Sequence, residues 1–208
     1  MTADRMSQLL QPYLSALLPQ ETLQHLLNFL ELLQRWNART NLTAIRDEDT
    51  LVQRQIGESL WCVQHIPVHC TTLLDFGSGA GFPGIPIALL RPHILVTLAE
   101  SQGKKASFLR EAIRLMNLTN TQVWPGRVQG LPAEVVFDVV AMRAVDDSDR
   151  ILPEALARVA ATGTLLRFAP LESAAPADWE QAIAARIPLL ESGLVGIRRV
   201  SRGTLTVQ

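Results

Sequence analysis

The chain of 208 residues carries a formal net charge of −1 and is 48% hydrophobic, so it is long and apolar enough to bury one substantial core. No apolar run approaches the ~20 residues that span a bilayer, and the two cysteines, Cys62 and Cys70, have neither CxxC spacing nor clustered histidines beside them. We therefore expect a protein of the reducing cytoplasm, without a membrane segment, a disulfide framework or a metal site, and with no global charge attraction to nucleic acid. We also expect a monomer, although no residue pattern argues for it.

The first third of the chain has the hydrophobic spacing of helices. Apolar residues recur every three or four positions over 21–36, which predicts an amphipathic helix. A second helix is predicted from Asp47, a good N-cap, to His65, and a loop over 37–46 joins the two. We expect residues 1–66 to form a small helical cap in front of a second domain at 67–208.

The rest of the chain alternates short apolar runs with helical stretches. The expected strands lie at 72–76, 94–99, 121–124, 137–142 and 164–168, and the expected helices lie at 85–90, 104–116, 150–160 and 178–185. This alternation predicts an α/β fold with a mostly parallel sheet covered on both faces. Two further runs, 189–200 and 204–207, predict a C-terminal antiparallel hairpin, which is unusual for a dinucleotide-binding fold.

Behind the first of these strands the sequence reads LLDFGSGAGFPGIP, which holds four glycines and two prolines. Gly77, Gly79 and Gly81 permit a tight turn with positive φ and let a ligand approach the backbone. Pro83 and Pro86 suit the first turn of a helix. The segment therefore predicts a strand, a glycine turn and a helix start that together cradle a nucleotide-sized ligand at the carboxyl end of a strand.

Two carboxylates bear on which nucleotide binds. Glu100 ends the next strand and can accept both ribose hydroxyls of NAD or of S-adenosylmethionine, although a surface acid at a strand end is also possible there. Asp75 stands two residues before Gly77, where it would repel a pyrophosphate and attract the ammonium and sulfonium of S-adenosylmethionine. An acid that only orders the loop is the alternative for Asp75. S-adenosylmethionine is favoured, and an NAD-dependent oxidoreductase stays open because the segment also matches GxGxxG.

The end of the fourth strand, VAMRA, indicates what kind of atom accepts the methyl group. It lacks the acid or amide with two prolines that amine methylation uses. Both cysteines precede the glycine loop, and the only two lysines lie on the helix after Glu100. The acceptor is then nucleophilic as it stands, as guanine N7 is, and placement alone drives the transfer. Arg143 would orient the acceptor, the methionine carboxylate of the donor or a phosphate, unless it forms a structural salt bridge with an aspartate at 146, 147 or 149.

Basic residues mark candidate contacts with RNA. Lys104 and Lys105, the only lysines, stand together on the helix after the second strand, and Arg46 and Arg54 lie in the N-terminal segment. Such side chains can hold phosphates, but solvated helix faces are an equally simple explanation. Trp36 is more often a core residue than a platform for a base.

The chain resembles the bacterial 16S ribosomal RNA guanine-N7 methyltransferase G family, also called glucose-inhibited division protein B. The resemblance covers most of the chain and rests on the segments RWNARTNLTAIRD, LLDFGSGAGFPGIPIALLRP, LAESQGKKASFLR, GRV and MRA. It implies a class I methyltransferase with a Rossmann-like, mostly parallel seven-stranded sheet. It also implies that S-adenosylmethionine is used to make 7-methylguanosine in small-subunit rRNA, either naked or in an assembling subunit.

The resemblance also assigns roles by position. Gly77 and Phe82 would line the donor pocket, Val128 and Gln129 would flank the adenine, and Arg143 would complete the site.

Some positions depart from the family pattern. Glu100 replaces the usual Asp at the ribose, and Gln55 and Glu58 stand where the family has His and Asp. Ala169 with the proline after it replaces a usual Lys-Gly. These departures leave open a third hypothesis, a module that binds S-adenosylmethionine and rRNA without turnover.

Overall fold

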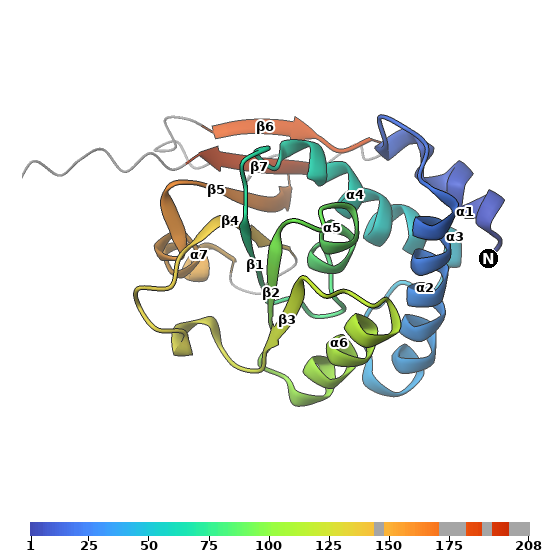
Figure 1. Cartoon of the computed structure of the whole chain (residues 1–208), viewed down its shortest axis with the longest axis horizontal. Helices are drawn as coiled ribbons and strands as arrows, with labels where there is room; N and C mark the ends of the chain where they lie inside the picture. The colour runs from blue at the N-terminus through green and yellow to red at the C-terminus, as the bar shows by residue number, and fades with distance from the viewer. Residues whose placement is uncertain (144–147, 171–181, 189–192, 200–208) are drawn as a thin grey trace, which may run out of the picture.

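The computed structural model describes residues 1–143, 148–170, 182–188 and 193–199. Within these residues a seven-stranded sheet has the order β3-β2-β1-β4-β5-β7-β6, with helices packed on both faces (Figure 1). The strands from β1 to β5 pair in parallel, and β7 pairs antiparallel with both β5 and β6. The strand bounds are β1 Thr72–Phe76, β2 Leu95–Ala99, β3 Thr121–Trp124, β4 Phe137–Met142, β5 Val159–Pro170, β6 Ala182–Arg186 and β7 Gly193–Arg199.

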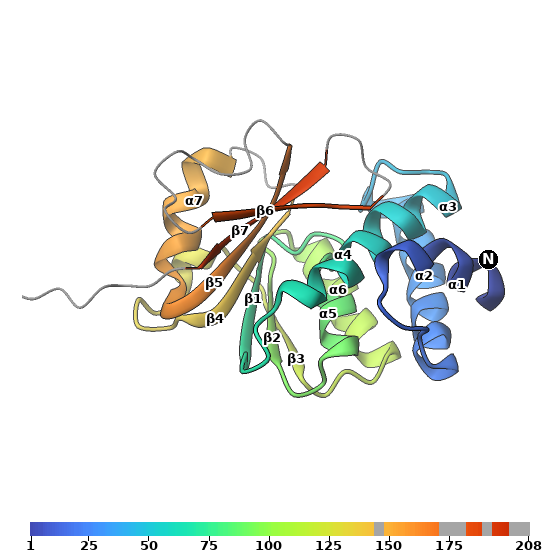
Figure 2. The same cartoon turned by 90° about the horizontal axis from the view of Figure 1, so that it is seen from above.

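The helices form two layers on one face of the sheet and one layer on the other. Figure 2 shows α7 alone on one face, with α5 and α6 on the opposite face and the N-terminal helices outside them. The helix bounds are α1 Ala3–Leu10, α2 Gln20–Thr40, α3 Glu48–Leu51, α4 Glu58–Cys62, α5 Gly84–Leu90, α6 Gly103–Leu115 and α7 Ser148–Ala157, with a π-helical stretch at Val52–Gly57.

Local chemistry sets the ends of the N-terminal helices. Asn41 is left-handed, with φ of 50°, and ends α2. Asp47 caps α3 by accepting a hydrogen bond from the Thr50 N–H at 2.8 Å. The predicted first helix is therefore confirmed and runs on to Thr40, so the loop after it begins later than expected.

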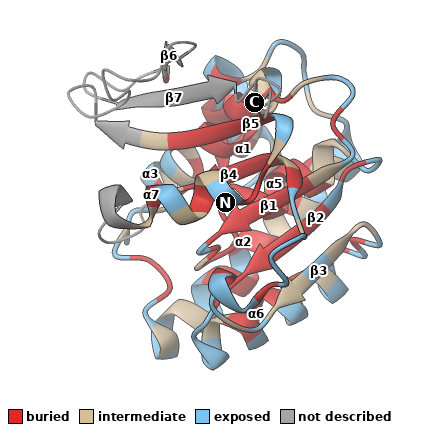
Figure 3. Cartoon of the chain, turned by 90° about the vertical axis from the view of Figure 1, so that its left-hand side faces the viewer, coloured by how far each residue is buried: buried red, intermediate tan, exposed pale blue. Residues whose placement is uncertain are grey.

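Alternation along β1 sends its side chains to two separate cores. Leu74 and Phe76 pack with α7, whereas Leu73 packs with α5, α6 and the N-terminal helices. The central strands β1, β2 and β4 are buried along most of their length (Figure 3). Asp75 shares the α5 side of the strand with Leu73, which places a carboxylate inside the larger core.

The N-terminal helices share that core with the sheet. Phe29 of α2 contacts Phe82 of the glycine loop, with ring centroids 5.4 Å apart, and stacks on Phe108 of α6 at 6.1 Å. The expected division at residue 66 stays a prediction. Among the described residues, none of the helices combines the length and apolar character that crossing a membrane requires.

The parallel part of the sheet confirms the expected strands, whereas one C-terminal expectation is wrong. The helix expected over 178–185 is instead the strand β6, Ala182–Arg186. Its run AIAAR favours a helix by intrinsic propensity, but pairing with β7 overrides that preference. The run expected at 189–200 contains β7, which pairs with β6. The strand expected at 204–207 to pair with that run lies outside the described residues.

Candidate functional site

The glycine loop forms the tight turn that its sequence predicts. Gly77, Gly79 and Gly81 all have positive φ, of 72°, 54° and 85°, a region where other residues are strained. The Ser78 N–H donates to the Ala99 carbonyl oxygen at 2.9 Å, which joins the loop to the end of β2. The loop is therefore fixed to the carboxyl edge of the sheet, where parallel sheets bind ligands.

Asp75 is fully buried beneath this loop. Its Oδ2 accepts a hydrogen bond from the Gly84 N–H at 3.0 Å, while its Oδ1 has no hydrogen-bond partner among the described residues. Burial raises the pKa of this carboxyl to about 7, although the Gly84 bond opposes the shift. Asp75 thus orders the start of α5, as the alternative for this residue proposed, and an electrostatic effect on the donor stays a prediction.

Gly84 is required by the same packing. A Cβ at Gly84 would lie 2.4 Å from Leu98 Cδ2 and 2.6 Å from Asp75 Oδ2, well inside van der Waals contact. This glycine therefore allows close packing between the start of α5 and the sheet.

Glu100 lies at the carboxyl end of β2 and is only 6% exposed, so it is not a surface acid. Its Oε2 accepts a hydrogen bond from the Gly79 N–H at 3.0 Å, and its Oε1 accepts one from the Gln102 N–H at 2.7 Å. Each carboxylate oxygen has a second lone pair free for a hydroxyl donor. The residue thus joins the glycine loop to the start of α6 and keeps the acceptor capacity that a ribose requires.

Val128 and Gln129 lie in a short 3-10 turn after β3. Val128 is buried, whereas Gln129 is exposed and donates to the Glu154 carboxylate. Arg158 fixes this turn, because its guanidinium donates to the carbonyl oxygens of Val128, at 3.2 Å, and Leu131, at 2.8 Å. Sequence reasoning missed Arg158, since a buried arginine that binds only carbonyl groups has no sequence pattern of its own.

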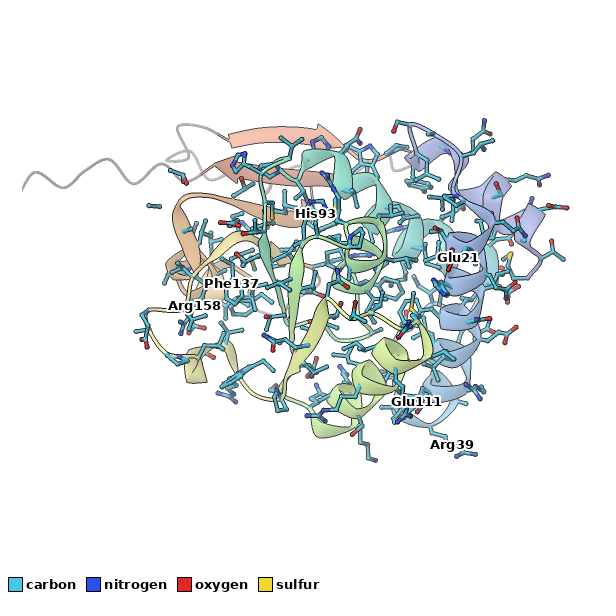
Figure 4. The ribbon with its side chains drawn as sticks, viewed as in Figure 1. Glu21, Arg39, His93, Glu111, Phe137 and Arg158 are labelled. Carbon is cyan, nitrogen blue, oxygen red and sulfur yellow. The ribbon has the colours of Figure 1, made fainter. Side chains whose placement is uncertain are left out.

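Arg158 also meets the start of β4. Its carbonyl oxygen accepts a hydrogen bond from the Phe137 N–H at 2.8 Å, and the two residues lie beside each other in Figure 4. Arg158 thereby links the turn that carries Val128 to the sheet, with its side chain bound to the turn and its backbone carbonyl bound to β4.

Arg143 follows β4 at the same edge of the sheet and turns toward the N-terminal helices. Its Nη2 lies 3.0 Å from Glu58 Oε2, and its guanidinium donates to the carbonyl oxygens of Arg54 and of Gln55. The guanidinium also lies 5.5 Å from the centre of the Phe168 ring. Burial lowers the pKa of Arg143, and Glu58 opposes this shift. The expected aspartate partners lie outside the described residues or among those whose side chains are not described.

Glu58 is shared by two arginines. Its side chain is 4% exposed, and its Oε1 lies 2.7 Å from Arg54 Nε on the preceding turn. Burial raises the pKa of Glu58, and Arg143 and Arg54 counteract the shift. The π-helical stretch before Glu58 widens the helix there, a feature that often accompanies functional positions. The sequence marked this position only as a departure from the family pattern, and the structure identifies it as the partner of Arg143.

The residues predicted to contact RNA come from different elements. Lys104 is exposed and Lys105 half-buried in the first turn of α6, which begins shortly after Glu100. Arg46 is exposed in the loop before α3, and Arg54 is half exposed and paired with Glu58. These four residues come from a loop, a π-helical stretch and α6, and their contacts with RNA stay predictions.

The cysteines occupy positions that do not suit catalysis. Both are free and buried. Burial raises the pKa of the Cys62 thiol far above its usual range, and raises that of Cys70 to about 11. Within the part of the chain that the structure describes, no three side chains of His, Cys, Asp or Glu gather to hold a metal ion.

Comparison with known proteins gives a consistent result. A family model described as rRNA small subunit methyltransferase G matches residues 22–169. The ribosomal RNA small subunit methyltransferase G of Xanthomonas euvesicatoria pv. vesicatoria is 39% identical over 180 residues, which cover 84% of this chain and 83% of the relative. That of Methylobacillus flagellatus is 43% identical over 130 residues, which cover 62% of each protein.

Solved structures agree on the fold. The O-methyltransferase of Bacillus cereus in complex with SAH has a TM-score of 0.60 at 16% identity, and the match covers 95% of this chain and all of that one. A putative O-methyltransferase of Klebsiella pneumoniae has a TM-score of 0.58 at 14% identity, over 83% of this chain and 90% of that one. At these identities the likeness concerns the fold alone.

Proposed function

The chain belongs to the rRNA small subunit methyltransferase G family and is an S-adenosylmethionine-dependent methyltransferase, and from this we propose that it transfers the methyl group to N7 of a guanine in small-subunit rRNA. The observation that carries the proposal is the set of residues found at the carboxyl edge of the sheet. There a buried carboxylate and a bare glycine loop meet. Both cysteines are buried, and the two lysines, Lys104 and Lys105, lie on α6 and not at the end of β4, where the acceptor is proposed to bind. Membership of a methyltransferase family argues against the alternative of an NAD-dependent oxidoreductase.

The residues present fit the donor. An added Cβ on Gly79 would meet only the Gly77 carbonyl oxygen, at 3.8 Å, so the backbone there faces open space. Glu100 stands beside that space with both carboxylate oxygens fixed by backbone N–H groups. We propose that it accepts the ribose hydroxyls. The other donor-site residues in the proposal are Asp75, Gly77, Gly79, Gly81, Phe82, Val128, Gln129 and Arg143.

The bound donor supplies a methyl group on a positively charged sulfonium. The chain's own contribution is placement, because guanine N7 has a lone pair and no proton to lose. In the transfer a bond forms between N7 and the methyl carbon, and the methyl–sulfur bond breaks with its electron pair staying on sulfur. Orientation of two reactants can supply about 7–11 kcal/mol of the barrier. A general base is therefore not needed, and Cys62, which is fully buried, offers no route through a covalent intermediate.

Arg143 acts in this proposal as a positioning residue. Its side chain is 11% exposed and paired with Glu58, so it holds the backbone of Arg54 and Gln55 against the end of β4. The acceptor guanine would enter between this edge and the N-terminal helices. The proposed cap, residues 1–66, thereby forms one wall of the acceptor site.

The proposed RNA partner is the small-subunit rRNA or the assembling small subunit in the cytoplasm, bound by a monomer. Arg46, Arg54, Lys104 and Lys105 would contact phosphates. They are spread over two elements and a loop, which suits an RNA surface wider than the donor pocket.

A labelling experiment tests the proposal. Small subunits and deproteinised rRNA from cells lacking this protein are incubated with methyl-labelled S-adenosylmethionine, and modified nucleosides are identified by nuclease digestion and mass spectrometry. We expect label only in 7-methylguanosine, and at least ~tenfold less of it with the variant Glu100→Ala when the donor concentration is below its Kd. Label in another nucleoside, or donor binding without any transfer to either RNA, would overturn the proposal.

A further inference from the structure

A cavity outside the donor edge combines positive charge with an aromatic side chain. It lies between the C-terminal end of α2 and the middle of α6 and has a volume of about 450 Å³, within the range of small-ligand pockets. Arg39 and Glu111, labelled in Figure 4, come to it from these two helices. The residues that line it, which we call the α2–α6 groove, are Arg35, Trp36, Ala38, Arg39, Thr40 and Glu111.

Trp36 is held in one orientation in this groove. Its indole packs edge-on against Phe108, with ring centroids 5.8 Å apart, and its Nε1–H donates to Glu111 Oε2 at 3.0 Å. The residue is only half-buried. A fixed and partly exposed indole is a platform on which a nucleobase stacks with little loss of side-chain freedom. The core role expected for Trp36 is therefore only part of what its position allows.

Two arginines flank the indole. Arg35 and Arg39 are one helical turn apart on α2, and both are exposed. Neither forms an ion pair with a described residue, whereas Arg54 and Arg143 both bind Glu58. Two unpaired guanidinium groups at this spacing suit a phosphate, which arginine binds through paired N–H donors.

Glu111 adds a hydrogen-bond acceptor at the same place. One carboxylate oxygen is used by Trp36, and the other makes no hydrogen bond with a described residue. A carboxylate beside a stacking platform accepts from the amino group of cytosine, adenine or guanine, and uracil has no such group. The groove thus presents separate contacts for the phosphate, the ring and the edge of a nucleotide.

The groove is also joined to the donor edge by packing. Trp36 contacts Phe108, Phe108 stacks on Phe29, and Phe29 contacts Phe82 of the glycine loop. In addition, α6 starts only three residues after Glu100. RNA that reaches the groove therefore lies against the same helix that begins at the donor site.

We propose that the α2–α6 groove binds one unpaired nucleotide of the RNA substrate, with the phosphate on Arg35 and Arg39, the base on Trp36 and its amino edge on Glu111. This inference rests on the proposed function, since it names a contact between the enzyme and its RNA. It is separate from the phosphate contacts proposed for Lys104 and Lys105.

Binding of short single strands tests the groove directly. Fluorescence anisotropy measures the affinity of the full chain for fluorescein-labelled oligocytidylate and oligouridylate, two pyrimidine strands that differ in the amino group. We expect oligocytidylate to bind more tightly. We expect the double variant Arg35→Gln, Arg39→Gln to weaken binding at least ~tenfold and to lower the slope of log K against log salt by about 0.7 for each arginine.

Arg110→Gln is the matched control. Arg110 is exposed on α6 and precedes Glu111, so it points about 100° around the helix from it. Its loss should change the affinity less than ~1.5-fold, well below the ~threefold per arginine that a tenfold loss in the double variant represents. Trp36→Leu, checked for melting temperature, should also weaken binding, because leucine fills space without stacking on a base.

The outcomes separate this inference from the proposed function. Equal losses per removed arginine in the double variant and in the control would reduce the effect to general charge and overturn the groove, as would an unchanged affinity in the double variant. Equal affinity for the two strands would overturn the role of Glu111. If the variants bind oligocytidylate normally but bind intact small subunits weakly, the occupant is a protein and the proposal is wrong. Calorimetry with S-adenosylmethionine should give wild-type affinity in every variant.

Discussion

Replacing Glu100 by alanine removes two backbone hydrogen bonds and the proposed ribose contact in one step. The lost acceptors are those of the Gly79 N–H, at 3.0 Å, and of the Gln102 N–H, at 2.7 Å. A hydrogen bond to a charged group contributes about 1.5–3 kcal/mol. Loss of a single such bond to the ribose would therefore raise the donor Kd about 10- to 150-fold.

The same change should cost folding stability, but less than the sum of the lost bonds. Alanine opens the space around both N–H groups, so water can replace part of what the carboxylate provided. We expect a loss of about 1–3 kcal/mol, which lowers Tm by about 2–12 °C in a domain of this size. The stability of Glu100→Gln should lie between those of the wild type and Glu100→Ala, because the glutamine amide keeps one oxygen that can accept from one of the two N–H groups.

Calorimetric titration with S-adenosylmethionine and thermal melting check both expectations. Glu134→Ala is the matched control, since Glu134 is exposed and forms no hydrogen bond or ion pair with a described residue. Its donor affinity and Tm should equal those of the wild type. A Glu100→Ala protein that melts early but binds the donor within about twofold of wild type would refute the ribose contact. The carboxylate would then only order the loop.

Three further predictions concern the surroundings of this edge. Gly84→Ala should reduce the donor affinity and lower Tm, as judged by calorimetry and melting, because its Cβ would collide with Leu98 and Asp75. The pKa of Asp75 is raised to about 7 in the folded chain from an ordinary value of 3.8, so its contribution is stabilising below pH 4 and is lost as pH rises toward 7. Denaturant titrations at pH 5.5 and 7.5 should therefore show a fall in stability that Asp75→Asn reduces. Glu58→Gln leaves Arg143 without its carboxylate, and breaking such a buried pair costs about 3–5 kcal/mol, or about 6–20 °C in Tm. An unchanged Tm in Glu58→Gln would mean that the carbonyl groups around Arg143 suffice.

The parallel half of the sheet could be predicted from the sequence because each of its strands is a short apolar run between helices. The strands expected at 72–76, 121–124 and 137–142 have the bounds that the structure gives. The strand β6 could not be found in this way. Its alanine-rich run has no apolar alternation, and its state is decided by pairing with β7, which lies later in the chain.

The geometry of the glycine turn and Glu100 was predictable, whereas the surroundings of Arg143 were not. A glycine turn and the acid at the end of the next strand belong to one βαβ unit, so their spacing in the sequence carries the geometry. The contact between Glu58 and Arg143 joins residues far apart in the chain. No local pattern specifies it, and the sequence suggested nearby aspartates as partners instead. Arg158 was missed for the same reason, because its partners are carbonyl groups.

The long-range contacts decide how the N-terminal helices relate to the chemistry. Phe29 packs against Phe82 of the glycine loop, and Glu58 pairs with Arg143 at the end of β4. One contact reaches the donor loop and the other reaches the acceptor edge, and both come from the proposed cap. Because a buried ion pair and an aromatic contact fix the cap at two separate places, it cannot shift without disturbing the loop or the edge. Phe29 and Glu58 therefore tie the proposed cap to the loop and to the end of β4, and substitutions at these two contacts should change donor binding as well as RNA binding.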